Sequence, residues 1–472
     1  MSADVTLLWL RRDFRFYDHP AMVAAAANGA AVIPVFIYDD QVAALGAAPK
    51  WRLGEAVDHF ADALAEKGSR LILRKGDPLE VLRALIAQTG ARAVHWSRAY
   101  DPASVARDKA VKAALKEDGI TAESQAGHLL FEPWSVQTGK GEPYKVYSPY
   151  WRAVKGRDIA APLKTVSELR APSNWPDSET LSDWQMGDAM NRGAEVVAKY
   201  AHIGEARAQG RLSTFLRDHI EHYKTERDFP ASGATSGLSE NLTYGEISPR
   251  AVWHAGWRHV QEGAAGAEHF LKELVWREFA WHLLYHFPDL AEANWRKEWN
   301  GFPWRPDNND AKAWRRGMTG EPFVDAAMRE MYVTGTMHNR ARMIVASYLT
   351  KHLMTDWRVG RRWFEDCLID WDPASNAMGW QWVAGSGPDA APYFRVFNPE
   401  TQLKKFDKTK DYRDKFILEG QSNPPQTARD FFDAIPRSWG LTPDQSYPAQ
   451  IADLKGGREC ALAAYHAHRD TD

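Results

Sequence analysis

The segment 270–288, FLKELVWREFAWHLLYHFP, combines helical apolar periodicity with a small group of chemically active side chains. Glu273, Trp276 and Arg277 lie three and four residues apart, so a helix would place them on one face. A carboxylate beside an indole could bind an organic base, the ring by stacking and the carboxylate by a hydrogen bond. A Glu273–Arg277 surface pair beside a core tryptophan explains the same spacing, and the sequence leaves both interpretations open.

A second helical segment, 337–349, carries Asn339, Arg342 and Met343 at positions i, i+3 and i+4. An amide, a guanidinium and a thioether on one face would be unusual if that face were only core. Arg342 suits an anionic ring or a carboxylate partner. The alternative, in which Arg340 and Arg342 are simply solvated, is less favoured because apolar residues flank the stripe.

The segment 368–387 is irregular at its start and rich in polar and aromatic groups. These are Asp370, Asp372, Asn376, Trp380 and Trp382. Paired carboxylates suggest a metal ion or glycosidase chemistry. The surrounding indoles, together with Arg342, favour an organic π-system instead, and we expect no metal site.

The polar loop 223–242 contains two glycines and several hydroxyl side chains, among them Thr235, Ser236 and Ser239. Such a loop leading into a helix can hold a pyrophosphate through its hydroxyls and backbone N–H groups. A plain N-cap formed by Thr235 or Ser239 explains the same residues, and this stretch alone favours the cap.

The elements that must position these residues follow two patterns. Strands expected at 5–10, 31–39, 70–77, 92–97 and 120–124 alternate with helices at 20–29, 52–67, 78–89 and 103–118. This alternation predicts a parallel, doubly wound α/β domain over residues 1–127. Prolines interrupt a connector over 128–195. Helical periodicity then dominates 196–472, a larger all-α domain, with helices expected at 196–224, 249–262, 266–286, 322–333, 336–354, 358–367 and 456–468.

Composition narrows the function classes. Lys and Arg total 59 and Asp and Glu total 62, so a nucleic-acid partner would need a local basic patch. Two cysteines, Cys367 and Cys460, cannot supply four ligands to a structural zinc or an iron–sulfur cluster. No G-x-G-x-x-G or P-loop pattern follows the first strand. The 21 tryptophans suggest a large aromatic core or a task that uses indole rings.

Targeting signals are also informative. No stretch of 18 apolar residues is present, so we expect no membrane-spanning helix. The N-terminal sequence MSADVTLLWLRRDFRF places its arginines after the apolar run, whereas a secretory signal has basic residues first. We therefore expect a cytoplasmic protein, acting as a monomer.

Several blocks carry a family resemblance when read together. They are LLWLRRDFRFYDHPAM, RDFPASGATSGLSENLTYGEISPR, ELVWREF, TGTMHNRARM and DWDPASNAMGWQWVAGSGPDAAPYFRVFNP. In order and spacing they resemble the DNA photolyase/cryptochrome family along nearly the whole chain, most closely bacterial cyclobutane pyrimidine dimer photolyases of class I and class III. Phe14, His19, Phe270 and Trp371 depart from the family's usual residues, and we expect the first two to alter packing only.

The resemblance implies an FAD-binding helical domain. The pyrophosphate and ribityl groups would contact Tyr223, Thr235, Ser236, Leu238 and Ser239. The isoalloxazine would be surrounded by Arg277, Asn339, Arg342, Asp370, Asp372 and Asn376. Arg342 and Asp370 would pair beside the ring, where a guanidinium stabilises the reduced anion in a dry pocket. Asn376 would lie near the flavin N5, where plant cryptochromes typically carry Asp.

The resemblance also implies a reaction and a substrate. Photoexcited reduced FAD would pass an electron to a pyrimidine dimer flipped out of DNA, the ring would split, and the electron would return. Catalytic contacts would come from Glu273, Asn339, Met343 and Asn376. DNA and lesion contacts would come from Arg227, Glu273, Trp276, Arg340, Trp382 and Arg395, with Lys404 and Lys405 as further candidates.

Three tryptophans match the family's electron-transfer chain: Trp380 nearest the flavin, then Trp357, then Trp304 at the surface. The α/β domain would host a second antenna chromophore. Ala103 and Ser104 replace the residues that grip folate in class I members, so a deazaflavin, a differently held folate or no antenna stay open.

The resemblance leaves rival activities open. A cryptochrome-type blue-light receptor and a (6-4) photolyase share this fold and cofactor. Asn376 favours repair over signalling. His338 alone does not supply the histidine pair of (6-4) enzymes. Outside the family, a flavin oxidoreductase would usually need a nicotinamide fingerprint, which the sequence lacks.

Overall fold

A computed structural model describes residues 4–389, 393 and 395–469. Its N-terminal part is a five-stranded sheet of order β3-β2-β1-β4-β5 in which every pair is parallel. The strands are β1 (Val5–Leu10), β2 (Ala31–Tyr38), β3 (Ile72–Lys75), β4 (Ala93–Ser97) and β5 (Thr121–Gln125). The helices between them are α1 (Pro20–Ala25), α2 (Asp40–Ala43), α3 (Ala47–Glu66), α4 (Pro78–Thr89) and α5 (Pro102–Glu117), with a 3₁₀ turn at Ala27–Gly29.

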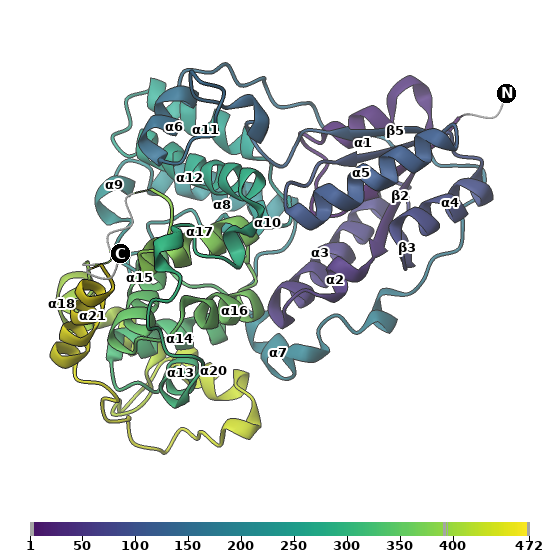
Figure 1. The fold of residues 1–472 in the computed structure, drawn as a ribbon. Coiled ribbons are helices and arrows are strands. Elements are labelled where there is room, and N and C mark those ends of the chain that lie inside the picture. The colour runs from purple at the N-terminus through teal and green to yellow at the C-terminus, as the bar shows by residue number, and fades with distance from the viewer. Residues whose placement is uncertain (1–3, 390–392, 394, 470–472) are drawn as a thin grey trace.

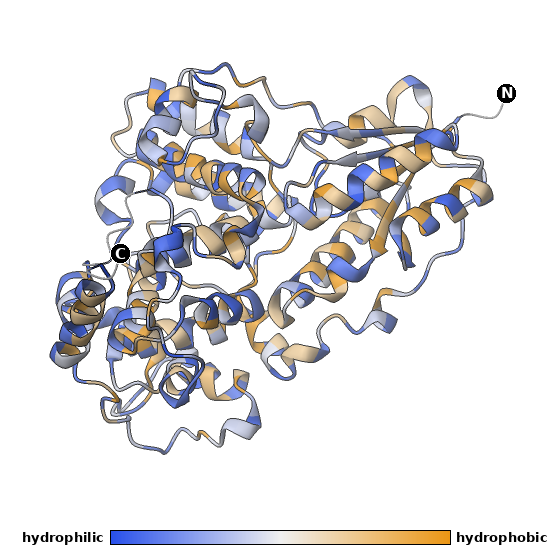
Figure 2. Ribbon diagram, viewed as in Figure 1, coloured by the Kyte–Doolittle hydropathy of each residue, from blue (hydrophilic) through white to orange (hydrophobic). Residues whose placement is uncertain are grey.

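Period-two alternation along β1 fills two separate cores. Leu8 and Leu10 face a cluster that includes α1 and α3 residues, whereas Leu7 and Trp9 face a cluster with α4 and α5 residues. Strands buried on both faces read as continuous apolar runs, as β1 and β2 do. The predicted parallel α/β sheet is confirmed, and Figure 2 shows hydrophobic colours along β2.

From Glu205 onward the chain is mostly helical and lies in the left-hand lobe of Figure 1. In sequence, the connector contains α6 (Tyr147–Val154), α7 (Gly193–Val197) and 3₁₀ turns at Pro133–Ser135, Leu181–Trp184 and Asp188–Met190. Its α6 packs in the left-hand lobe, whereas Trp184 packs against Phe36 and Tyr38 of β2. The first helices of the lobe are α8 (Glu205–Asp218), α9 (Tyr223–Glu226), α10 (Ser239–Thr243), α11 (Pro249–Gln261) and α12 (Ala267–His286), followed by 3₁₀ turns at Pro288–Ala291 and Lys297–Trp299.

The later helices complete this lobe. They are α13 (Asn309–Arg315), α14 (Pro322–Thr334), α15 (Asn339–Ser347), a π-helical turn (Tyr348–His352), α16 (Trp357–Cys367), α17 (Pro373–Ala384), α18 (Pro399–Phe406), α19 (Asp411–Phe416), α20 (Gln426–Ala434), a 3₁₀ turn (Arg437–Trp439) and α21 (Leu454–Arg469). Two cores form: one among α6, α11 and α12, the other among α14, α15, α16 and α20. In the described part of the chain, no helix is long and apolar enough to cross a membrane.

The helix expected over 196–224 is interrupted, so that prediction is wrong. The chain leaves α7 at Val197 and re-enters helix at Glu205. Gly204 between them has φ 95°, and a Cβ there would lie 2.0 Å from the His59 ring. A residue with this conformation cannot continue an α-helix.

The block LRRDFRFYDHPAM joins the two lobes. The Glu205 carboxylate accepts the backbone N–H groups of Phe16 and Tyr17 at 2.8 and 2.9 Å. Buried Arg15 donates to the Gly245 carbonyl at 2.9 Å, and Asp18 pairs with Arg250. These buried polar bonds between distant segments fix the lobes together.

The two unusual residues of this block have local roles. Phe14 is buried against Phe36 and Phe60, with ring centroids 6.1 and 5.8 Å away, so it serves packing as expected. His19 does more than pack, because its Nδ1 caps α1 by accepting the Met22 N–H at 3.1 Å. Burial lowers the pKa of His19 to about 4, which keeps the ring neutral and able to accept.

Candidate functional site

A cavity of about 720 Å³ lies between the two helical cores. Its lining comes from the 230–239 loop, α12, α15 and the start of α17, which are far apart in sequence. Large cavities with a few placed polar groups are typical ligand sites. Most of the expected site residues line it: Tyr223, Arg227, Thr235, Ser236, Leu238, Ser239, Glu273, Trp276, Arg277, Asn339, Arg342, Met343, Asp370, Asp372, Asn376, Trp380 and Trp382. Phe270 and Trp371, two departures from the family pattern, line it as well.

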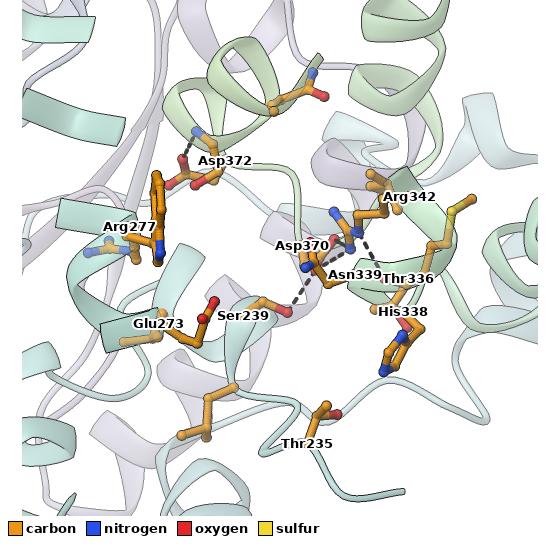
Figure 3. A pocket seen from close by; sticks show the side chains of 18 of the residues that line it. Thr235, Ser239, Glu273, Arg277, Thr336, His338, Asn339, Arg342, Asp370 and Asp372 are labelled. Atoms are coloured by element: carbon orange, nitrogen blue, oxygen red, sulfur yellow. Dashed lines mark hydrogen bonds and ion pairs between the residues drawn. The ribbon is translucent and has the colours of Figure 1, made fainter. Parts of the chain in front are cut away.

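The ion pair between Arg342 and Asp370 is part of the cavity lining. Arg342 Nη2 donates to both carboxylate oxygens of Asp370 at 2.9 and 2.7 Å, and Ser239 Oγ donates to the same carboxylate at 2.7 Å (Figure 3). Arg342 Nε also donates to the Met337 carbonyl at 2.8 Å. The guanidinium is therefore fixed in direction, as a cation beside an anionic ligand must be.

Asp372 is held differently from Asp370. It caps α17, where its Oδ1 accepts the Ser375 N–H at 2.7 Å. Its Oδ2 accepts the indole N–H of buried Trp281 at 2.8 Å. Two N–H donors therefore aim this carboxylate, and the donor from α12 is a residue that sequence reasoning missed.

Replacing Trp281 with phenylalanine is expected to weaken FAD binding about five- to tenfold. The ring packing stays, but Asp372 loses one hydrogen bond, worth about 1 kcal/mol. Fluorescence titration of the apoprotein with FAD measures the change. The matched control is Trp253→Phe, a buried indole that does not line the cavity. Equal affinity in the Trp281 variant and the control would remove Trp281 from the site.

The loop that could hold a pyrophosphate has a cation beside it. Arg211 lines the cavity and pairs with buried Glu240 at 3.5 Å. Gly237, with φ 62°, lets this side chain approach, because a Cβ there would lie 1.8 Å from Arg211 Nη2. Burial lowers the pKa of Arg211, yet a guanidinium stays charged at neutral pH. α10 begins without a side-chain cap hydrogen bond. The fixed cation and the hydroxyls therefore favour the pyrophosphate interpretation of this loop over the plain N-cap.

Glu273 and Arg277 do not pair with one another, so that interpretation of their spacing is wrong. Glu273 forms an ion pair with Arg227, and His269 Nε2 lies 3.7 Å from the same carboxylate. Arg277 turns toward the connector, donating to the His128 carbonyl at 3.0 Å. These long-range partners are available because α9, which leads into Arg227, and the 3₁₀ turn of the connector both pack on α12.

Trp276 is held flat against a second ring. Its indole stacks on Tyr147 with centroids 3.6 Å apart and planes 8° from parallel. The Tyr147 hydroxyl donates to the Lys272 carbonyl at 2.6 Å, which anchors the stack to α12. A pre-positioned indole at a cavity wall can stack on a planar ligand with little loss of side-chain entropy.

Two buried acids near the cavity carry shifted pKa values. Burial raises the pKa of Glu278 to about 7, although the Leu130 and Phe131 N–H groups bind its carboxylate. Burial likewise raises the pKa of Glu330, a lining residue, to about 7, while the Tyr412 hydroxyl donates to it at 2.5 Å. Burial lowers the pKa of lining residue His338 to about 4, so it is neutral at neutral pH.

Four expected site residues lie outside the lining. Arg340 pairs with Asp228 at 2.5 Å, and exposed Arg395 offers its carbonyl to Lys351. Trp357 is fully buried on α16, which packs on the α17 helix of Trp380, and donates to Asn294 at 2.9 Å. Trp304 is partly buried, its ring 5.7 Å from that of Trp299.

The residues fit an FAD. The cavity size, the aimed Arg342 and the Arg211 loop match a long ligand with anionic groups. The Asn376 amide donates to the Arg361 carbonyl at 3.1 Å, which fixes its orientation in the lining. The indole N–H of Trp380, also in the lining, is buried without a hydrogen-bond partner in the described part of the chain.

Known proteins agree with this geometry. Residues 6–168 match the family model "DNA photolyase", and residues 270–467 match "FAD binding domain of DNA photolyase". The chain is 46% identical to a deoxyribodipyrimidine photo-lyase of Agrobacterium fabrum over 98% of both chains. It matches a bacterial class III photolyase structure from Agrobacterium tumefaciens with TM-score 0.92 and 45% identity, covering 100% of this chain and 98% of that one. An archaeal photolyase from Sulfolobus tokodaii, described with two FAD molecules, matches with TM-score 0.79 and 26% identity over 98% and 100% of the chains. The chain therefore belongs to the DNA photolyase family.

Proposed function

We propose that this chain is a deoxyribodipyrimidine photo-lyase that repairs cyclobutane pyrimidine dimers in DNA with light absorbed by a bound, reduced FAD. The supporting observation is that a single cavity carries both kinds of contact. Arg342, held by Asp370, and Arg211 line it as partners for an anionic cofactor, and Glu273 and Trp276 line it as partners for a nucleobase. When bound, the photoexcited reduced flavin supplies the electron that splits the dimer.

The protein's own residues would bind the flavin, fix its orientation and shield it from water. The Asp370 carboxylate and the Met337 carbonyl fix the direction of the Arg342 guanidinium, so a cation is pre-positioned where it would stabilise an electron-rich ring. Asp372, aimed by two N–H donors, would accept a hydrogen bond from the pyrimidine edge of the flavin. Asn376 and Asn339 would supply amide contacts at the ring.

The lesion would lie against α12. Glu273 would accept a hydrogen bond from a pyrimidine N–H, while Trp276 and Trp382 would form the walls and Met343 would fill the space between. The ion pair with Arg227 compensates the charge of Glu273. A lesion that gains negative charge would therefore not face an unbalanced carboxylate.

The DNA backbone would be held by cations around the cavity. Arg227, Arg340 and Arg395 are the proposed phosphate contacts, together with Lys404 and Lys405, which are exposed on the helix α18 that Arg340 contacts at Phe406. Such contacts fix the duplex without reading its sequence. The net charge of −3 makes this local arrangement necessary.

Blue-light illumination of the reduced protein with a dimer-containing oligonucleotide tests the function. Restored pyrimidines, measured by loss of the dimer in chromatography and absent in the dark, support repair. A flavin that cycles under light while all dimers persist would instead favour a receptor of the cryptochrome type. Repair of (6-4) photoproducts and not of dimers would favour a (6-4) photolyase. The lone His338 in the lining argues against that activity, because (6-4) enzymes use a pair of histidines.

Replacing Glu273 with alanine is expected to lower the repair yield about tenfold while FAD stays bound. The lesion loses its carboxylate acceptor and Arg227 loses its partner, a change of roughly 1.5–3 kcal/mol for a charged hydrogen bond. Repair per absorbed photon with pre-reduced enzyme measures it. Glu268→Ala is the matched control, since that exposed glutamate on α12 pairs only with Lys272 among the described residues. An unchanged yield would remove Glu273 from the mechanism.

The domain limits at 127 and 195, a second antenna chromophore, the cytoplasmic location and the monomeric state stay predictions. The relative described with two FAD molecules supports looking for a second pigment on the α/β domain. Extraction of the purified protein followed by chromatography of its chromophores would identify one. Light scattering measures the oligomeric state.

A further inference from the structure

An exposed phenylalanine, Phe229, lies close in sequence to residues that line the cavity. Among the described residues, four large apolar side chains are exposed: Val23, Trp134, Val146 and Phe229. Phe229 has 39% of its surface exposed and is next in sequence to Pro230, which lines the cavity with nearby Arg227. Among these four, Phe229 is the one whose sequence neighbours line the cavity, so its exposed ring lies close to the candidate site.

The ring is held in place. Phe229 packs edge-on against Phe406 of α18, with centroids 5.6 Å apart and planes 73° apart. Its carbonyl accepts both the N–H and the hydroxyl of Ser232, at 3.1 and 2.7 Å, and its N–H donates to the Glu226 carbonyl at 3.0 Å. Phe406 itself is buried. The exposed part of Phe229 is therefore a rigid projection and not a loose side chain.

Positive charge surrounds this projection. The Arg340 guanidinium lies 4.7 Å from the centre of the same Phe406 ring, and Lys404 and Lys405 are exposed in the last turn of α18. Asp228, the acid next to Phe229 in sequence, is paired with Arg340. An apolar ring among cations matches a nucleic-acid surface, where cations meet phosphates and an aromatic ring meets a base.

We propose that Phe229 stacks on a nucleobase that borders the gap left in the duplex by the extruded dimer. This inference rests on the proposed function, because flipping leaves the bases beside and opposite the lesion without a stacking neighbour. Phe229 stands next to the cavity that would receive the dimer, so its ring lies where that gap opens. Stacking does not depend on which base is present, as a repair enzyme that acts in any sequence requires.

Three substitutions at this position separate stacking from simple apolar cover. In Phe229→Trp a planar ring is kept, in Phe229→Leu the apolar contact with Phe406 is kept without a flat face, and in Phe229→Ser both are lost. We expect the leucine and serine variants to bind a duplex containing one dimer about tenfold more weakly, and the tryptophan variant to bind as the parent does. Val23→Ser on α1, an exposed apolar residue of the α/β domain, is the control.

The salt dependence of binding supplies a second readout. Loss of stacking should leave the slope of log K against log salt unchanged, whereas Arg340→Ala should reduce its magnitude by about 1. Flavin absorbance and circular dichroism of each variant check that the fold is retained. Parent-like binding by the leucine variant, or a reduced slope in it, would overturn the stacking proposal.

The test also separates this inference from the function on which it rests. If the parent protein repairs dimers under light and the leucine variant binds them equally well, only the role of Phe229 fails. If the parent protein repairs no dimers, the proposed function itself fails. A dinucleotide dimer, which has no neighbouring bases, should be bound and repaired equally by all four proteins.

Discussion

Asp370→Asn protein is expected to purify largely without FAD and to show no measurable light-driven repair. The aspartate accepts two hydrogen bonds from Arg342 and one from Ser239. Asparagine keeps the shape but removes the charge, and its NH₂ group cannot accept from either donor. Two weakened charge-assisted bonds at roughly 1.5–3 kcal/mol each correspond to a loss of affinity of at least a hundredfold.

The ratio of flavin to protein absorbance after gel filtration measures this loss. Asp366→Asn is the matched control, because that carboxylate accepts the Ala47 N–H at 2.9 Å and does not line the cavity. We expect the control to keep its flavin and to unfold at nearly the parent temperature. An Asp370 variant that retained a full complement of FAD would show that the Arg342 pair does not support the cofactor.

Trp357→Phe is expected to slow photoreduction of the oxidised enzyme by at least tenfold and to leave repair by pre-reduced enzyme intact. Phenylalanine is far harder to oxidise than tryptophan, so a chain that passes through this position would be interrupted. Trp357 is fully buried on α16, directly against the α17 helix that carries Trp380. The substitution also removes the indole N–H that donates to the Asn294 side-chain oxygen, so we expect a small decrease in the free energy of unfolding.

A second tryptophan makes this experiment discriminating. The ring of Trp314 lies 6.0 Å from that of Trp380, is equally buried, and donates to the Val345 carbonyl. Trp314→Phe therefore imposes a similar packing cost without touching the proposed chain. Absorbance changes under illumination with an external reductant compare the two. Slow photoreduction in the Trp314 variant and normal rates in the Trp357 variant would assign the electron path to Trp314.

Local periodicity predicted most of the α/β domain. Continuous apolar runs predicted β1 at the observed residues and β2 to within one residue, because a strand buried on both faces is apolar at nearly every position. Helix interruptions were harder to predict. The turn at Gly204 depends on the approach of His59 from α3, and no local pattern in the sequence encodes that contact.

The candidate site shows the same division. Spacings of three and four placed Asn339, Arg342 and Met343 together in one cavity wall, as helix geometry requires. Partners from elsewhere in the chain could not be predicted. Glu273 pairs with Arg227 and not with Arg277, which donates to the His128 carbonyl. The ion-pair partner of Glu273 is therefore determined by the packing of distant segments and not by the residue spacing within α12.

The buried bonds around Arg15, Asp18 and Glu205 have a consequence for light capture. Domains that share only a wet, polar boundary rock against one another, whereas these are clamped by desolvated charges and backbone donors. A pigment seated on the N-terminal sheet would then keep one separation and one dipole orientation relative to the central chromophore. Every molecule of the protein would then transfer excitation energy from that pigment to the central chromophore with the same geometry. The fixed arrangement of the two lobes, and not the pigment, would set this uniformity.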